Sequence, residues 1–247
     1  MSSISSIKEP VKKELEDFEV FFRNQAQSPY KSLDFILTYI VRRKGKQLRP
    51  LFVFLSAKLH GEVGESTHIA ATMIELLHTA TLIHDDVVDE AYERRGFWSI
   101  NALWRSKIAV LVGDFILSKG LLVSVEHKEF EMLATMSNAV NEMSEGELFQ
   151  IEKSRKMDIN EEEYFSIIRK KTATLIAACT SSGARSAGAD ASTVDKMYEL
   201  GIQMGMAFQI KDDLFDFQPA ALTGKPSGND IKEKKLTLPL IHALSNS

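Results

Sequence analysis

The sequence is poor in residues that interrupt helices and in residues that cross-link chains. Its 247 residues include 13 glycines, 6 prolines and a single cysteine, Cys179. One cysteine excludes an internal disulfide and fits a reducing compartment. The formal net charge of −4 disfavours a general nucleic-acid-binding protein, so we expect no nucleic acid among its partners. The scarce glycines and prolines fall mainly between periodic segments, as they do where helices meet loops.

Long apolar runs are also scarce. Residues 1–19 are polar and charged and lack the apolar core of a signal peptide. Apolar stretches such as Ile108–Val112 are short and soon interrupted by charge, so we expect no transmembrane segment. Hydrophobic residues make up 44% of the chain and charged residues 26%, which is ordinary for a soluble protein with a core. We therefore expect a cytoplasmic protein.

Helical periodicity is present over most of the chain. Apolar residues recur in steps of three and four in five segments: 66–90, 107–126, 129–151, 161–181 and 191–217. Breaks fall near residues 28–29, 61–64, 95–99, 182–190 and 219–229, and none is long enough for a domain linker. Strand-like alternation is hard to find. We predict an all-α protein with a single domain over residues 1–247.

The most informative motif occurs twice. Asp85-Asp86-Val87-Val88-Asp89 is matched by Asp212-Asp213-Leu214-Phe215-Asp216, and both end long apolar helical stripes. The first and third aspartates of each motif are one helical turn apart and share a face. Like charges at this spacing destabilise a helix by roughly 0.2–0.5 kcal/mol per pair, and they oppose the dipole at a helix C-terminus. Two such motifs favour a bound cation over a pair of solvated acidic helix ends.

The ligand type favours magnesium. Carboxylates without companion histidines or cysteines suit a hard cation, and magnesium binds through a few carboxylates while it keeps waters or substrate phosphates. Calcium would need a loop of alternating ligands with a glycine turn, which neither motif has. His78 precedes Asp85 by seven residues and Gln209 precedes Asp212 by three, so each shares the face of its motif.

Basic residues near the acidic motifs predict a diphosphate site. Arginine donates to phosphate oxygens in bidentate geometry. Pro50 predicts a helix start, and it places Lys46 and Arg49 beside that start. The candidate phosphate ligands are Lys46, Arg49, Arg94, Arg95, Lys171, Thr172, Lys225 and Lys235. Each basic residue alone is better explained as a surface charge; the combination with two acidic motifs favours function.

These motifs, in this order, resemble the trans-type polyprenyl diphosphate synthases over nearly the whole chain. The resemblance rests on Gly45–Pro50, Glu75–Asp89, Arg94-Arg95-Gly96, Asn101–Trp104, Gly113-Asp114, Lys171-Thr172, Gln209–Asp216, Gly224-Lys225-Pro226 and Asp230–Pro239. The acidic motif alone is weak evidence, because terpene cyclases share it. Gln47 stands where many members have arginine.

The resemblance implies a fold, a reaction and roles for residues. The fold is an antiparallel helical bundle of the isoprenoid synthase type around a central cavity, usually dimeric. The reaction extends an allylic diphosphate with isopentenyl diphosphate. Asp85, Asp86, Asp89 and Asp212 would hold Mg²⁺ ions that bridge the allylic diphosphate, and Asp85, Asp89, Asp212 and Lys171 would be catalytic. Arg94, Lys171, Thr172, Gln209, Lys225 and Lys235 would contact the allylic diphosphate, and Lys46, Arg49, His78 and Arg95 would hold isopentenyl diphosphate.

Two further expectations come from the resemblance. An aromatic side chain near the positions of Ala80 and Thr81 shortens the product in the family, so the small residues here predict a chain longer than geranylgeranyl. Family members also usually continue with further helices beyond the position of Ser247, so we expect the chain to be C-terminally incomplete, with these helices missing.

Three alternatives stay open at this point. A terpene cyclase would share the first acidic motif, but it would not need Lys46 and Arg49 for a second diphosphate. A metal-dependent phosphohydrolase is suggested by His84-Asp85 with His60 and His68 nearby. A non-catalytic partner subunit of a synthase is the third alternative, although the intact acidic motifs disfavour it.

Overall fold

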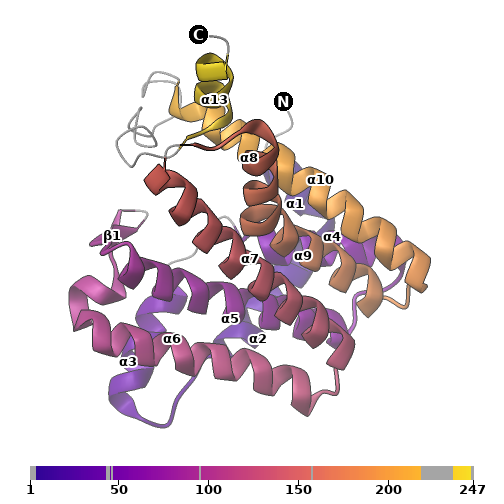
Figure 1. The fold of residues 1–247 in the computed structure, drawn as a ribbon. Helices are drawn as coiled ribbons and strands as arrows, with labels where there is room; N and C mark the ends of the chain where they lie inside the picture. The colour runs from indigo at the N-terminus through magenta and orange to yellow at the C-terminus, as the bar shows by residue number, and fades with distance from the viewer. Residues whose placement is uncertain are drawn as a thin grey trace. The chain divides into compact units, whose positions relative to one another are not determined.

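The computed structural model describes residues 4–42, 45, 47–94, 96–156, 158–217 and 236–245, apart from the side chains of Arg94 and Ser245. Nearly all of these residues lie in helices, so the predicted all-α class is confirmed (Figure 1). An antiparallel ribbon of two short strands, β1 (Glu93–Arg94) and β2 (Phe97–Trp98), follows the first acidic motif. The chain divides into two compact units: unit 1 is Met1–Ala134 with Ser182–Ala191, and unit 2 is Thr135–Ser181 with Ser192–Ser247.

Unit 1 contains most of the N-terminal helices. They are α1 (Ile4–Lys8), the 3-10 turn η1 (Glu9–Val11), α2 (Lys12–Gln25), α3 (Lys31–Arg42), α4 (Leu48–His60), α5 (Glu65–Val88) and α6 (Ile100–Glu126). Pro50 lies in the first turn of α4, as predicted, where a missing N–H costs no helical hydrogen bond.

Helix α5 is the central helix of unit 1. Its buried residues point in every direction around the helix and include Ile69, Met73, Leu76 and Ala80. A helix that is apolar on all sides is one that neighbours surround, and α2, α4 and α6 all pack against it. Its C-terminal turn is different, because there the carboxylates of the first acidic motif interrupt the apolar pattern.

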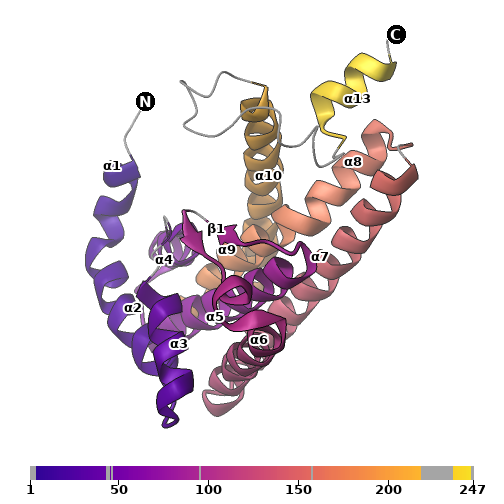
Figure 2. The ribbon, with the colours of Figure 1, turned by 90° about the vertical axis from the view of Figure 1, so that its left-hand side faces the viewer.

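Helix α6 runs antiparallel to α5, and the two helices lie side by side (Figures 1 and 2). Residues that pair along the two helices run in opposite order: Gly113 lies under the ring of His84, and Gly120 packs on Leu77. Nearer the start of α5, the Ser124 hydroxyl donates to the Met73 sulfur at 2.7 Å. The glycines let α6 approach closely, which fixes the position of the α5 end that bears the acidic motif.

By length and composition, α6 is also long and apolar enough to cross a membrane. Its inner face, with Ala109, Val112 and Ile116, belongs to the apolar core of unit 1, as expected for the core helix of a globular unit. A membrane span and a core helix both match the length and composition of α6, and the expected lack of a membrane segment stays a prediction.

Unit 2 is built from five elements that run partly or wholly through it. These are α7 (Phe130–Lys156), α8 (Glu161–Ile168), the π-turn η2 (Arg169–Ala173), α9 (Thr174–Ser186) and α10 (Ala191–Asp216), and α13 (Leu238–Ser245) follows. Asn160 caps α8 by accepting from the Glu163 N–H at 2.9 Å, while the Glu163 carboxylate accepts from the Asn160 N–H at 3.0 Å. Helix α13 lies beside α8 (Figure 2), and Ile241 of α13 packs with Tyr164 and Ile168 of α8.

One predicted boundary is wrong. The sequence placed a break from Ser182 onward, but α9 continues to Ser186. Serine is tolerated here because its hydroxyl bonds back to the preceding turn: Ser181 Oγ donates to the Ala177 carbonyl at 2.7 Å. Ser186 Oγ likewise donates to the Gly183 carbonyl at 2.8 Å.

Candidate functional site

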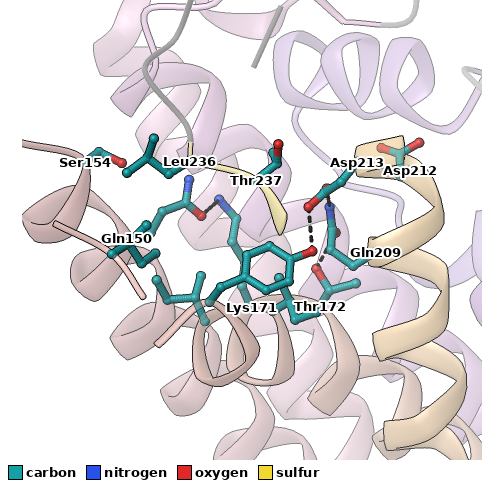
Figure 3. A pocket seen from close by; sticks show the side chains of 13 residues that line it. Gln150, Ser154, Lys171, Thr172, Gln209, Asp212, Asp213, Leu236 and Thr237 are labelled. Carbon is teal, nitrogen blue, oxygen red and sulfur yellow. Dashed lines mark hydrogen bonds between the residues drawn. The ribbon is translucent and has the colours of Figure 1, made fainter. Parts of the chain in front are cut away.

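A pocket of about 250 Å³ lies within unit 2 beside the second acidic motif (Figure 3). It is formed by residues of α7, α8, η2 and α10 together with the segment before α13. The lining residues are Gln150, Ser154, Ile159, Tyr164, Ile167, Ile168, Lys171, Thr172, Gln209, Asp212, Asp213, Leu236 and Thr237. Four residues predicted from the sequence, Lys171, Thr172, Gln209 and Asp212, are thus brought together.

The π-turn η2 orients the two lysines of this segment. In it the Thr174 N–H bonds to the Arg169 carbonyl, so the turn contains one residue more than an α-helical turn. Lys170 then reaches Glu145 of α7 at 2.7 Å. Lys171 forms an ion pair with Glu147 and donates to the Gln150 carbonyl oxygen at 3.2 Å. Two α7 side chains therefore hold the Lys171 ammonium group at the pocket wall, and Figure 3 shows the contact with Gln150.

Gly146 explains how α7 comes close enough for these contacts. A Cβ at position 146 would lie 2.9 Å from the Lys170 Cβ and 3.1 Å from the Lys171 backbone nitrogen. These separations are shorter than side chains tolerate, so a larger residue at position 146 would push α7 away from η2.

Two further glycines bring α10 against η2 and α9. A Cβ on Gly201 would overlap Ala177, and a Cβ on Gly205 would overlap Ala173. Gln209 follows Gly205 by four residues and so continues the same helix face. The Thr172 hydroxyl donates to the Gln209 carbonyl oxygen at 2.9 Å, which joins the two elements at the pocket.

The two neighbouring aspartates of the second motif have different environments. Asp212 is half-buried and faces the pocket, whereas Asp213 is only 6% exposed. Asp213 Oδ2 accepts from the Tyr164 hydroxyl at 2.6 Å, and Oδ1 accepts from Gln209 Nε2 at 2.7 Å. The pKa of Asp213 lies above its ordinary value, chiefly because the carboxyl is buried and also because Asp212 and Asp216 are near; the hydrogen bonds from Tyr164 and Gln209 offset part of this rise.

The first acidic motif, in unit 1, follows the same pattern. The helix of α5 extends to Val88, and the Asp89 N–H bonds to the Asp85 carbonyl at 2.8 Å. Asp85 is half-buried and Asp89 exposed, but Asp86 is only 5% exposed. In both motifs the second aspartate is buried and the first is only half-buried, so the structure distinguishes residues that the sequence pattern treats alike.

The other predicted ligands in unit 1 are described only in part. Arg49 lies half-buried in the first turn of α4, and His78 is 7% exposed on α5, two turns before Asp85. Gln47 donates to Glu19 of α2 at 3.2 Å. Lys46, Arg95, Lys225, Lys235 and the side chain of Arg94 lie outside the described residues.

The two residues predicted to control product length differ in environment. Ala80 is 1% exposed and belongs to the apolar core cluster of unit 1. Thr81 is half-buried, and its hydroxyl donates to the His78 carbonyl at 2.8 Å. Thr81 is therefore the position where a larger side chain can be introduced with less disturbance of the core.

The described part of the chain holds no group of three or more His, Cys, Asp or Glu side chains that could bind a metal ion by themselves. His68 packs against the rings of Phe21 and Phe54, as a core histidine does. His84 pairs with Asp114 at 3.4 Å. A hydrolase site assembled from His60, His68, His84 and Asp85 is thus not supported.

Several residues that shape this pocket were not predicted from the sequence. Glu147 and Gln150 hold Lys171, and Tyr164 holds Asp213. One signal was available: Tyr164 precedes Lys171 by seven residues, a spacing of two helical turns. No comparable signal marked Asp213 as the buried member of its motif.

Comparison with known proteins assigns the chain to a family. The model of the polyprenyl synthetase family matches residues 30–247, and the chain belongs to this family. The octaprenyl diphosphate synthase of Escherichia coli (strain K12) is 40% identical over 207 residues, which are 83% of this chain and 64% of that protein. The chain therefore spans somewhat less than two thirds of that relative's length.

Solved structures agree with this assignment. The decaprenyl diphosphate synthase from Rhodobacter capsulatus matches with a TM-score of 0.91 and 32% identity, over 98% of this chain and 75% of that chain. The polyprenyl synthase from Caulobacter crescentus CB15, complexed with calcium and isoprenyl diphosphate, matches with a TM-score of 0.88 and 32% identity, over 98% and 74% of the respective chains. The predicted isoprenoid synthase type of fold is thus confirmed.

Proposed function

We propose that the protein is a prenyl transferase that condenses isopentenyl diphosphate with an allylic diphosphate and releases diphosphate. The observation that carries this proposal is the unit 2 pocket, where Lys171, Thr172, Gln209 and Asp212 converge. The Lys171 ammonium group and the Gln209 amide are donors that suit phosphate oxygens, and the Thr172 hydroxyl donates to the Gln209 oxygen. At about 250 Å³ the pocket fits a polar head group better than a whole prenyl diphosphate.

The relatives favour the same activity. Those compared above are named octaprenyl and decaprenyl diphosphate synthases, and one solved polyprenyl synthase holds isoprenyl diphosphate. Family membership and the ordered motifs also disfavour the terpene cyclase alternative. The intact acidic motifs disfavour a non-catalytic subunit.

We propose magnesium as the metal, with Asp85 and Asp89 as candidate ligands in unit 1 and Asp212 as a candidate ligand in unit 2. All three are at least partly exposed, and no histidine or cysteine joins them in a preformed cluster within the described residues. A few carboxylates without a closed cage suit a cation that keeps waters and substrate phosphates. Asp86 fits this role less well, because it is almost fully buried. When bound, magnesium supplies positive charge that balances the charge growing on a departing diphosphate.

The chain's own residues bind, orient and exclude water. Lys171 Nζ and the Gln209 amide donate to the diphosphate of the allylic substrate, while Arg49 and His78 hold isopentenyl diphosphate. The allylic C–O bond breaks, the double bond of isopentenyl diphosphate attacks the resulting cation, and a C–C bond forms. A proton then leaves to the released diphosphate. Fixed donors stabilise the growing charge, and apolar side chains along α5 keep water from the cation.

A direct assay tests this function. Purified protein is incubated with MgCl₂, geranyl or farnesyl diphosphate and labelled isopentenyl diphosphate, and the products are resolved by chain length. We expect elongated prenyl diphosphates that disappear with chelator and in the Asp212→Ala variant. Release of inorganic phosphate without elongation would replace the proposal with hydrolysis.

We further propose a homodimer in the cytoplasm. Helix α6 carries a set of exposed apolar side chains that favour association: Leu103, Ile108, Val110, Leu111, Leu121, Leu122 and Val125. Light scattering coupled to size exclusion should give twice the mass of the chain, and Leu111→Lys with Leu121→Lys should give the monomer mass. An unmodified protein that elutes as a monomer would contradict this assembly.

A further inference from the structure

Asp213 occupies a position that its motif alone does not explain. Both of its carboxylate oxygens are engaged, Oδ2 with the Tyr164 hydroxyl at 2.6 Å and Oδ1 with Gln209 Nε2 at 2.7 Å. The side chain is 6% exposed, whereas Asp212 beside it is half-buried and faces the pocket. Asp213 therefore serves as an acceptor for neighbouring side chains in unit 2.

The Asp213 carboxylate determines which way the Gln209 amide faces. A carboxylate only accepts, so Gln209 must present its NH₂ group to Asp213 and its carbonyl oxygen to Thr172. The Thr172 hydroxyl has one hydrogen, and it donates this hydrogen to the Gln209 oxygen at 2.9 Å. The remaining Nε2 hydrogen of Gln209 is not used by Asp213 and can be donated within the pocket that Gln209 lines.

The opposite amide orientation would be unfavourable for an anion. It would turn the Gln209 carbonyl oxygen to where a donor is needed, and an oxygen lone pair repels phosphate oxygens. Tyr164 supports the arrangement from α8, because its ring is 3% exposed and packed against Ile168 and Ile241. Its hydroxyl is thus fixed in the direction of Asp213.

We propose that Asp213 and Tyr164 are positioning residues, which hold the Gln209 amide so that its NH₂ group donates to the substrate diphosphate. This inference rests on the proposed function, since it assigns a diphosphate to the unit 2 pocket. Both residues line the pocket, but their polar atoms bond to each other and to Gln209, so they act on the diphosphate through Gln209, and Thr172 completes the orientation from the other side.

Binding of inorganic diphosphate in the presence of MgCl₂, measured by isothermal titration calorimetry, tests the proposal. Gln209→Met removes the amide, and Asp213→Asn lets the amide adopt either orientation. We expect each variant to bind about tenfold more weakly than the unmodified chain, as for the loss of one hydrogen bond to a charged group. Tyr164→Phe should weaken binding in the same direction by a smaller factor.

The double variant Asp213→Asn/Gln209→Met separates positioning from a general structural effect. If Asp213 acts through Gln209, the double variant binds no more weakly than Gln209→Met alone. If the two losses multiply to about a hundredfold, or if Asp213→Asn binds like the unmodified chain, the proposal is wrong. Tyr198→Phe, a partly buried tyrosine that packs elsewhere in unit 2, is the control and should bind normally.

Two outcomes distinguish this inference from the proposed function. Diphosphate binding with the expected cycle but without prenyl product would overturn the proposed function alone. A lack of diphosphate binding by the unmodified chain would overturn both. Thermal unfolding of each variant shows whether it is folded, and a variant that does not fold is replaced by Tyr164→Phe, which keeps the buried ring.

Discussion

Gly205 of α10 lies so close to Ala173 of the π-turn that a Cβ on Gly205 would fall 2.8 Å from the Ala173 Cβ and still nearer its Cα. Gly201, one turn before Gly205 on α10, lies equally close to Ala177, which is one turn after Ala173 in α9. These contacts set the separation of the two elements, and Gln209 and Thr172 meet at the end of the same row. Backbone packing in unit 2 thus determines a side-chain contact in the pocket.

Gly205→Ala is therefore expected to destabilise the protein. Alanine gains about 1 kcal/mol over glycine in a helix interior. Overpacking against backbone costs about 1–3 kcal/mol or more and outweighs that gain. Urea unfolding should show a lower midpoint, and diphosphate binding should weaken because Gln209 moves away from Thr172. Met204→Ala, at a position 36% exposed on the same helix, is the control, and an unchanged midpoint for Gly205→Ala would contradict the close packing of α10 against Ala173.

The open and buried aspartates of the first motif should respond differently to substitution. Asp85→Ala is expected to abolish magnesium-dependent turnover while it leaves the thermal midpoint nearly unchanged, since Asp85 is half-buried at a helix end. Asp86→Ala is expected to lower the free energy of unfolding by about 1–3 kcal/mol, because it removes a buried acceptor and leaves the group that pairs with it unsatisfied. Turnover and thermal unfolding of both variants check this, and equal effects would argue that burial does not separate their roles.

The sequence predicted the helices well and the details of the pocket poorly, for physical reasons. The apolar period of 66–90 is long, so it located α5 to within about two residues of its bounds. The π-turn was missed because a single inserted residue hardly changes a period of 3.6. Which aspartate of each motif is buried depends on partners such as Tyr164, which lie far away in sequence. Lys171, Thr172, Gln209 and Asp212 were found because they belong to motifs of known chemistry.

The capping box of α8, formed by Asn160 and Glu163, should make the stability of the protein depend on pH. Hydrogen bonds from Lys153 and from the Asn160 N–H lower the pKa of Glu163 below its ordinary value of 4.5. A lowered pKa adds stability that is fully present above the ordinary pKa and is lost as pH falls through the folded-state pKa. Glu163→Gln should therefore be less stable than the unmodified chain at pH 7, and the difference should shrink below pH 4.5.

Urea unfolding at several pH values measures this difference. Glu162→Gln, on the exposed side of the same turn, is the matched control, and its effect should be much smaller. A difference for Glu163→Gln that stays constant from pH 7 to pH 3.5 would show that the carboxylate charge does not matter to the cap. Asn160→Ala, which removes the other half of the capping box, should cost about 1 kcal/mol at neutral pH.

Product length should respond to Thr81 and stability to Ala80. Thr81→Phe places a ring at a half-buried position one turn before Asp85, so we expect shorter products from labelled isopentenyl diphosphate and a nearly normal thermal midpoint. Ala80→Phe adds a ring where the side chain is 1% exposed in a packed cluster, so we expect a loss of stability first. Thr79→Phe is the matched control: Thr79 is equally half-buried, and its hydroxyl also bonds back to the helix, to Glu75 at 2.7 Å, but it lies on another face of α5. If Thr79→Phe shortens the product as much as Thr81→Phe does, or if neither changes it, the face of α5 that bears Thr81 does not limit chain growth.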